Sequence, residues 1–146
     1  KGGKNPNRAG VEHLGMKPIQ DVSILGKVVV AMQRLSPKDV EEIKEAQPKY
    51  LILLATNEDE SLEIADLVLP TATFAEQRGS FTNHARRVQA FEKALELKGE
   101  MLPAWQWMKH LAEVLGKDFN GVNAGSLLKE FFGMEWKDLG AEGKEL

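Results

Sequence analysis

Two apolar runs constrain the fold of this chain more than any other feature. They are KVVVAM at residues 27–32 and KYLILLA at residues 49–55. Continuous apolar runs of this length, without polar alternation, are typical of strands that are buried on both faces of a parallel sheet. We therefore expect two neighbouring strands in the interior of a small sheet.

The segment between the two runs, SPKDVEEIKEAQP, has the features of a short helix. Ser36 suits the N-cap position, Pro37 suits the first helical position, and Asp39 stands where a capping box has its acid. Pro48 ends the helix. A strand, a helix and a strand in this order predict a βαβ unit with parallel strands and a right-handed crossover.

The pattern continues with a second short helix and a third strand. Asn57 is the candidate cap for the helix in NEDESLEIA, and DLVLP is a strand that ends at Pro70. The resulting βαβαβ order is Rossmann-like. No G-x-G-x-x-G sequence follows either of the first two strands, so we do not expect a dinucleotide site.

The remaining segments divide the chain into four predicted parts. Residues 1–26 are an irregular lead-in with one helical turn near Val11–Leu14, and residues 27–70 are the Rossmann-like core. Residues 71–102 form a motif-bearing connection in which SFT and RVQAF can pair as extended segments, and residues 103–146 are mainly helical. The predicted fold class is α/β, a small Rossmann-like parallel sheet followed by a helical C-terminal extension.

Composition excludes several classes of function. The 146 residues carry a net charge of −3, which gives no electrostatic reason to expect nucleic acid. No apolar run approaches the roughly 20 residues of a membrane helix, so we expect no direct membrane insertion. The chain has no Cys, which excludes disulfides, thiolate zinc sites and iron–sulfur ligation, and its three His lack metal-ligand spacing. The start at Lys1 without a Met favours a fragment of a longer polypeptide.

One segment is dense in arginine. Arg78, Arg86 and Arg87 lie close together in the sequence, beside Asn83 and Gln89. Grouped guanidinium groups can hold a phosphate or a carboxylate, because each offers several N–H donors in a fixed plane. They can equally anchor the segment to neighbouring carbonyl groups and acids. The residues alone leave a free-standing anion-binding module and a structural anchor both open.

Two stretches of the sequence resemble the molybdopterin oxidoreductase superfamily. The longer is ADLVLPTATFAEQRGSFTNHARRVQ, followed by LPAWQWMKHLAEVLG, and the shorter is NRAGVEHLGMKP. Within the superfamily, the sequence is most similar to the C-terminal region of the large iron–sulfur subunit of bacterial NADH–quinone oxidoreductase, respiratory complex I. The positions that match the family pattern are Asn7, Gly10, Gly15, Pro18, Ala65, Asp66, Leu69, Pro70, Thr73, Phe74, Glu76, Gly79, Phe81, Thr82, Asn83, Arg87, Val88, Gln89, Pro103, Trp105, Leu115 and Gly116.

The longer stretch departs from the family pattern at one point. After the asparagine the family has a glutamate and a glycine before the arginine, whereas this chain has His84-Ala85-Arg86-Arg87. In the molybdenum enzymes of the family this region approaches the pterin. A side chain at Arg86 would obstruct an approach for which glycine leaves room. We therefore expect a degenerate domain that binds no cofactor.

The resemblance implies a non-catalytic structural domain in the hydrophilic arm of a complex I-like NADH–quinone oxidoreductase, supporting electron transfer carried out elsewhere. Iron–sulfur clusters would belong to the rest of the subunit or to its partners. Those partners would be other subunits of the oxidoreductase, in the cytoplasm or at the cytoplasmic face of the inner membrane. The alternative is the C-terminal part of a molybdopterin-dependent oxidoreductase such as formate dehydrogenase. Its pterin-contacting residues would then be Thr82, Asn83, Arg87 and Gln89.

Overall fold

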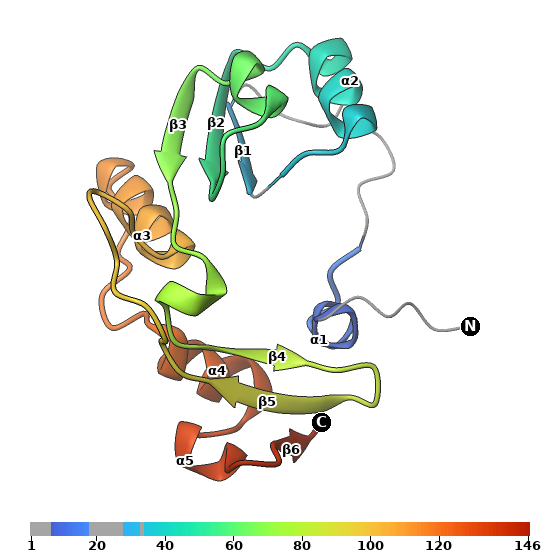
Figure 1. Ribbon diagram of the computed structural model, residues 1–146, viewed down its shortest axis with the longest axis vertical. Coiled ribbons are helices and arrows are strands. Elements are labelled where there is room, and N and C mark those ends of the chain that lie inside the picture. The colour runs from blue at the N-terminus through green and yellow to red at the C-terminus, as the bar shows by residue number, and fades with distance from the viewer. Residues whose placement is uncertain (1–6, 18–27, 33) are drawn as a thin grey trace. The chain divides into compact units, whose positions relative to one another are not determined.

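The computed structural model describes residues 7–17, 28–32 and 34–146, which form two compact units (Figure 1). The sheet unit comprises the described residues of 19–73 together with 97–110. The hairpin unit comprises the described residues of 1–18 together with 74–96 and 111–146. Each unit contains its own three-stranded sheet.

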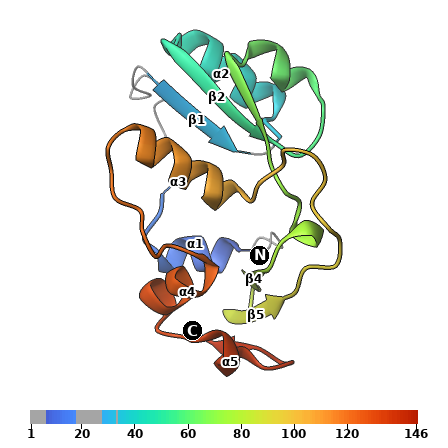
Figure 2. The ribbon, with the colours of Figure 1, turned by 90° about the vertical axis from the view of Figure 1, so that its left-hand side faces the viewer.

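The sheet unit is built on a parallel sheet. Its strands β1 (Val28–Met32), β2 (Tyr50–Ala55) and β3 (Leu67–Pro70) lie in the order β1-β2-β3. The helix α2 (Pro37–Ala46) connects the first two strands, and a short 3-10 helix, η2 (Glu60–Ile64), connects the second and third. Figure 2 shows the three strands side by side with α2 behind them. The predicted α/β class and the βαβ order are confirmed.

The two connecting helices begin with side-chain caps, one as predicted and one not. At α2, the amide of Asp39 donates to Ser36 Oγ (3.2 Å) and the amide of Ser36 donates to Asp39 Oδ2 (2.8 Å), which is the predicted capping box. At η2 the predicted cap, Asn57, is wrong. The N-cap is Asp59, whose carboxylate accepts from the amide of Ser61 at 2.9 Å. Because this helix begins three residues beyond Asn57, the later acid is the one within reach of its free amides.

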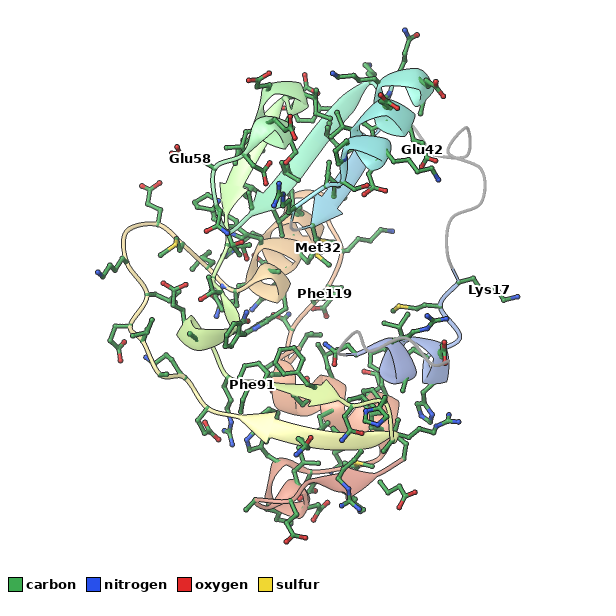
Figure 3. All side chains as sticks on the ribbon, turned by 45° about the vertical axis from the view of Figure 1, so that its right-hand side comes forward. Lys17, Met32, Glu42, Glu58, Phe91 and Phe119 are labelled. Atoms are coloured by element: carbon green, nitrogen blue, oxygen red, sulfur yellow. The ribbon has the colours of Figure 1, made fainter. Side chains whose placement is uncertain are left out.

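The predicted burial of both strand faces holds for β2 but is wrong for β1. Residues 51–54 of β2 are at most 7% exposed. In β1, Val28 is 58% and Met32 is 56% exposed (Met32 is labelled in Figure 3), while Val29 packs against Ile43 of α2. One face of β1 is exposed because β1 is an edge strand of this sheet and α2 covers only its other face. An apolar run alone does not distinguish an edge strand from a central one.

The hairpin unit is built on an antiparallel sheet. The strands β4 (Gly79–Thr82) and β5 (Arg87–Phe91) pair as predicted for SFT and RVQAF. A short strand near the end of the chain, β6 (Lys144–Glu145), pairs with the other edge of β5. The helix α1 (Arg8–His13) overlaps the predicted helical turn near Val11–Leu14, begins three residues earlier than predicted, and contacts β4. The 3-10 helix η3 (Phe74–Glu76) precedes β4.

The C-terminal part supplies the core of the hairpin unit. The helix α3 (Ala104–Val114) follows Pro103 as predicted, and its residues up to His110 belong to the sheet unit. The helices α4 (Ala124–Phe132) and α5 (Trp136–Leu139) follow in the hairpin unit. The fully buried Val88 of β5 packs into a cluster with residues from the α4–α5 region, which are Leu128, Met134 and Leu139. This part is mainly helical, as expected, with β6 as an addition. The division of the chain at residues 26, 70 and 102 stays a prediction about domain organisation.

Candidate functional site

The β4–β5 hairpin carries the candidate residues that sequence reasoning named, and Asn83 lies in its turn. The amide of Asn83 donates to the carbonyl of Arg87 at 3.0 Å and closes the turn. The side-chain oxygen Asn83 Oδ1 accepts from the amides of Ala85 (2.9 Å) and Arg87 (3.0 Å). One asparagine therefore determines the path of the backbone through the turn.

Three of the four candidate side chains share one face of the hairpin, which we call the outer face. Arg87 and Gln89 are two residues apart on β5, so their side chains leave the strand on the same side. Asn83 Nδ2 donates to Gln89 Oε1 at 3.4 Å, and Arg87 Nη1 donates to the carbonyl of Gly143 at 3.2 Å. Gln89 is exposed, while Asn83 and Arg87 are half-buried. The outer face thus gathers two amides and one guanidinium group.

An aromatic cluster extends the outer face along the strands. The rings of Phe81 and Phe91 stack with centroids 4.8 Å apart, and Phe91 is labelled in Figure 3. Phe74 meets both rings edge-on at 6.4 and 6.5 Å and remains 66% exposed. Gly79 lies opposite Phe91 in the register, and a Cβ there would overlap Phe91 Cζ and stand 2.9 Å from Cε1. The glycine therefore leaves the space that the Phe91 ring occupies.

Thr82, the fourth candidate, faces the opposite side of the hairpin. Its residue is only 3% exposed, and its hydroxyl points toward α1, where a Cβ on Gly10 would stand 2.8 Å from Thr82 Oγ1. The amide of Thr82 donates to Asn7 Oδ1 at 2.8 Å, and the amide of Asn7 donates to the carbonyl of Thr82 at 2.9 Å. Sequence reasoning did not name Asn7 or Gly10 as site residues. The available signal was their place in the shorter stretch that resembles the family.

The three arginines do not form one anion clamp. Arg78 Nε lies 3.2 Å from Glu92 Oε1, and its guanidinium stacks over the Trp136 ring at 4.2 Å. Trp136 Nε1 donates to the same Glu92 oxygen at 3.1 Å. The four residues of β4 separate Arg78 from the turn, which contains Arg86 and leads into Arg87 at the start of β5. They span roughly 13 Å along the strand. The contacts of Arg78 and Arg87 are those of structural anchors.

Arg86 adopts a backbone conformation that usually belongs to glycine. Its φ is 63°, in the left-handed region, where a Cβ is unfavourable. This is the position at which the family pattern has glycine. The turn therefore has a conformation suited to the family's residue, and it presents an exposed arginine side chain there instead.

A sequence model of the molybdopterin oxidoreductase family matches residues 5–114. The chain belongs to the molybdopterin oxidoreductase family. The matched residues include α1, the whole sheet of the sheet unit and the β4–β5 hairpin with its outer face. The resemblance predicted from the two sequence stretches is therefore confirmed at the level of the family.

Curated relatives of the chain include alpha subunits of formate dehydrogenases. It is 38% identical over 93 residues to the F420-dependent formate dehydrogenase 2 subunit alpha of Methanococcus maripaludis, covering 58% of this chain and 14% of the relative. For the F420-dependent formate dehydrogenase 1 subunit alpha of the same organism the identity is 33% over 121 residues, covering 75% of this chain and 18% of the relative. For the F420-dependent formate dehydrogenase subunit alpha of Methanocaldococcus jannaschii it is 40% over 84 residues, covering 56% and 12%.

These relatives refine the predicted resemblance. The chain spans less than a fifth of the length of each of the three. They carry the name of formate dehydrogenase, so they support the molybdopterin-enzyme alternative rather than the narrower likeness to the large iron–sulfur subunit of complex I. In the described part of the chain, no three His, Asp or Glu side chains are arranged to hold a metal ion. Among those same residues, no helix is long and apolar enough to cross a bilayer.

Proposed function

We propose that this chain is part of a molybdopterin-dependent oxidoreductase of the formate dehydrogenase kind, and that its hairpin contacts the pterin cofactor. The relatives named as formate dehydrogenase alpha subunits support the enzyme class. The observation that carries the contact is the convergence of Asn83, Arg87 and Gln89 on the outer face. The chain would then act beside the other parts and subunits of a multisubunit enzyme, where any iron–sulfur clusters would also lie.

The chemistry of the outer face fits a pterin. A pterin ring has donors and acceptors along its edge, and the side chains of Asn83 and Gln89 offer both kinds of group. Arg87 uses one N–H group for Gly143, and a guanidinium has five, so further donors can meet a phosphate. The exposed ring of Phe74 offers a flat apolar contact beside them. When bound, the cofactor would supply the redox chemistry of its metal centre, and these residues would hold and orient it.

Thr82 has a different part in this proposal. Its side chain faces α1 and is buried, so it does not reach a ligand on the outer face. It would act through the backbone, by carrying Asn83 at the start of the turn.

The proposal is tested by Arg87→Ala in the natural, full-length polypeptide, with molybdenum and pterin measured per purified chain. The loss of a charge-assisted hydrogen bond is expected to weaken retention of the cofactor about tenfold or more. Arg86→Ala is the matched control: it removes a neighbouring exposed arginine and leaves the Asn83 hydrogen bonds in place, so cofactor content should not fall. Wild-type cofactor content in Arg87→Ala would contradict the proposed contact.

The second candidate function is the non-catalytic structural domain, as in an NADH–quinone oxidoreductase assembly on the cytoplasmic side of the membrane. Two observations favour it. His84-Ala85-Arg86 replaces the acid and the glycine of the family pattern. In addition, Asn83, Arg87 and Gln89 already make hydrogen bonds within the protein. The same assay separates the candidates, since a wild-type polypeptide purified without molybdenum and pterin would favour the structural domain.

A further inference from the structure

The two stretches that resemble the family meet in the hairpin unit. Asn7 belongs to the shorter stretch and Thr82 to the longer, and the two are 75 positions apart in the chain. The amide of Thr82 donates to Asn7 Oδ1 and the amide of Asn7 donates to the carbonyl of Thr82, at 2.8 and 2.9 Å. Both backbone polar groups of Thr82 thereby have their partners in one residue of the lead-in.

The conformation of Asn7 makes this double contact possible. Its φ is 67°, in the left-handed region that asparagine tolerates better than most residues. In this conformation its backbone N–H and its side-chain oxygen both meet β4, as the groups of an additional strand would. The other edge of the hairpin is paired with β6. The hairpin is thus held along both edges.

Gly10 brings α1 into direct contact with the same threonine. A Cβ at Gly10 would stand 2.8 Å from Thr82 Oγ1 and 3.2 Å from Thr82 Cβ. Phe132 of α4 lies on the same side, with Cζ 3.8 Å from that Cβ position. The helix can approach so closely only because residue 10 has no side chain.

A displacement of Thr82 would also displace the residues of the outer face. Asn83 follows Thr82 in the chain, and Asn83 Oδ1 holds the amide of Arg87 while Asn83 Nδ2 reaches Gln89. These are the side chains assigned to the cofactor above. They would move together with Asn83, because it supplies the contacts that link them.

We infer that Asn7 and Gly10 are positioning residues. They hold Thr82 on the side of the hairpin opposite the outer face, and so keep the side chains of the outer face in the arrangement that contacts the cofactor. This inference rests on the proposed function of the outer face. Asn7 itself contacts only the protein, so its effect on the cofactor is exerted through Thr82 and Asn83.

The test uses Asn7→Ala in the natural, full-length polypeptide, with two measurements. Hydrogen exchange of peptides that cover residues 79–91 is expected to accelerate at least tenfold. Molybdenum and pterin content is expected to fall, as in Arg87→Ala. Asn7→Asp, which keeps a side-chain oxygen acceptor and tolerates the left-handed conformation, should restore most of both properties. Arg8→Ala should change neither, because Arg8 makes an exposed ion pair with Glu12 on α1.

A second control separates positioning from loss of stability. Ile43→Val removes one methyl group from the core of the sheet unit, and its thermal midpoint is compared with that of Asn7→Ala. Unchanged exchange in Asn7→Ala would overturn the inference, as would an equal loss of cofactor in an Ile43→Val protein of similar or higher midpoint. Loss of cofactor in Arg87→Ala but not in Asn7→Ala would overturn the inference alone. Full cofactor content in Arg87→Ala would instead overturn the proposed function.

Discussion

Replacing Arg86 by glycine is expected to stabilise the hairpin unit. The φ of 63° places Arg86 in the left-handed region, where a Cβ costs roughly 1–2 kcal/mol. Glycine removes that cost, but its greater conformational freedom stabilises the unfolded chain by about 0.4–1 kcal/mol. Taking the middle of each range, the expected net gain in the free energy of unfolding is about 0.8 kcal/mol.

The contacts around Arg86 make the substitution a clean test of backbone conformation. Its amide donates to the carbonyl of Asn83 at 3.0 Å, and its carbonyl accepts from the amide of Leu146 at 2.9 Å. Both are main-chain contacts that glycine preserves. Arg86→Ala is the matched control, because it removes the exposed side chain but keeps the Cβ. Its stability should lie within about 0.5 kcal/mol of the original chain.

The assay is urea denaturation of the 146-residue chain, followed through the indole N–H signal of Trp136 by NMR. Trp136 lies in α5, so its signal reports on the hairpin unit. With a urea dependence of about 1–3 kcal/mol per molar, the gain corresponds to a midpoint shift of roughly 0.3–0.8 M. If Arg86→Gly unfolds at the same urea concentration as Arg86→Ala, or earlier, the argument from backbone conformation is refuted.

Two further substitutions test local contacts. Ser36 Oγ donates to Asp39 Oδ2 at 2.6 Å, and this hydrogen bond lowers the pKa of Asp39 below its ordinary value. The stabilisation from this hydrogen bond is therefore complete above the unfolded pKa of about 4 and is lost as the pH falls through the folded pKa. Ser36→Ala should lower the free energy of unfolding by about 1 kcal/mol at pH 7 and by less at pH 2–3, as measured by denaturation followed by circular dichroism. An equal cost at both pH values would contradict this. Gly79→Ala would place a Cβ against Phe91 Cζ and 2.9 Å from Cε1, and displacing that ring from its stack on Phe81 should cost about 1–3 kcal/mol. In a Phe91→Leu background the cost should shrink, and a double-mutant cycle without coupling would show that the ring is not the cause.

Local chemistry predicted the parts of the fold whose determinants lie close together in the sequence. The capping box of Ser36 and Asp39 needs only a spacing of three residues, and the pairing of β4 with β5 needs only a short turn. The exposed face of β1 could not be predicted in this way, because it depends on which strand is central and which face α2 covers. The cap of η2 was misplaced because Asn57 and Asp59 offer similar acceptors, and only the start of the helix selects between them.

In the candidate site, too, the residues that are close in sequence were predicted and the contacts between distant residues were not. Asn83, Arg87 and Gln89 belong to one continuous segment, so a resemblance in that segment named all three. The contact of Asn7 with Thr82 joins residues 75 positions apart, and no periodicity or spacing predicts such a pair. Arg78 shows the same limit, because its stacking partner Trp136 lies far along the chain. The sequence therefore identified the side chains that the site presents, but not the long-range contacts that hold them in place.

The discontinuous make-up of the hairpin unit has a consequence for synthesis on the ribosome. Val88 is buried by Leu128, Met134 and Leu139, which are translated well after β5. At about 5–20 residues per second, roughly 3–10 s pass between the synthesis of Val88 and that of Leu139. During that interval the inner side of the hairpin lacks its cover, while the strands of the parallel sheet have all been made. The nascent chain would thus offer chaperones an apolar surface on β5 until the helices that enclose it emerge.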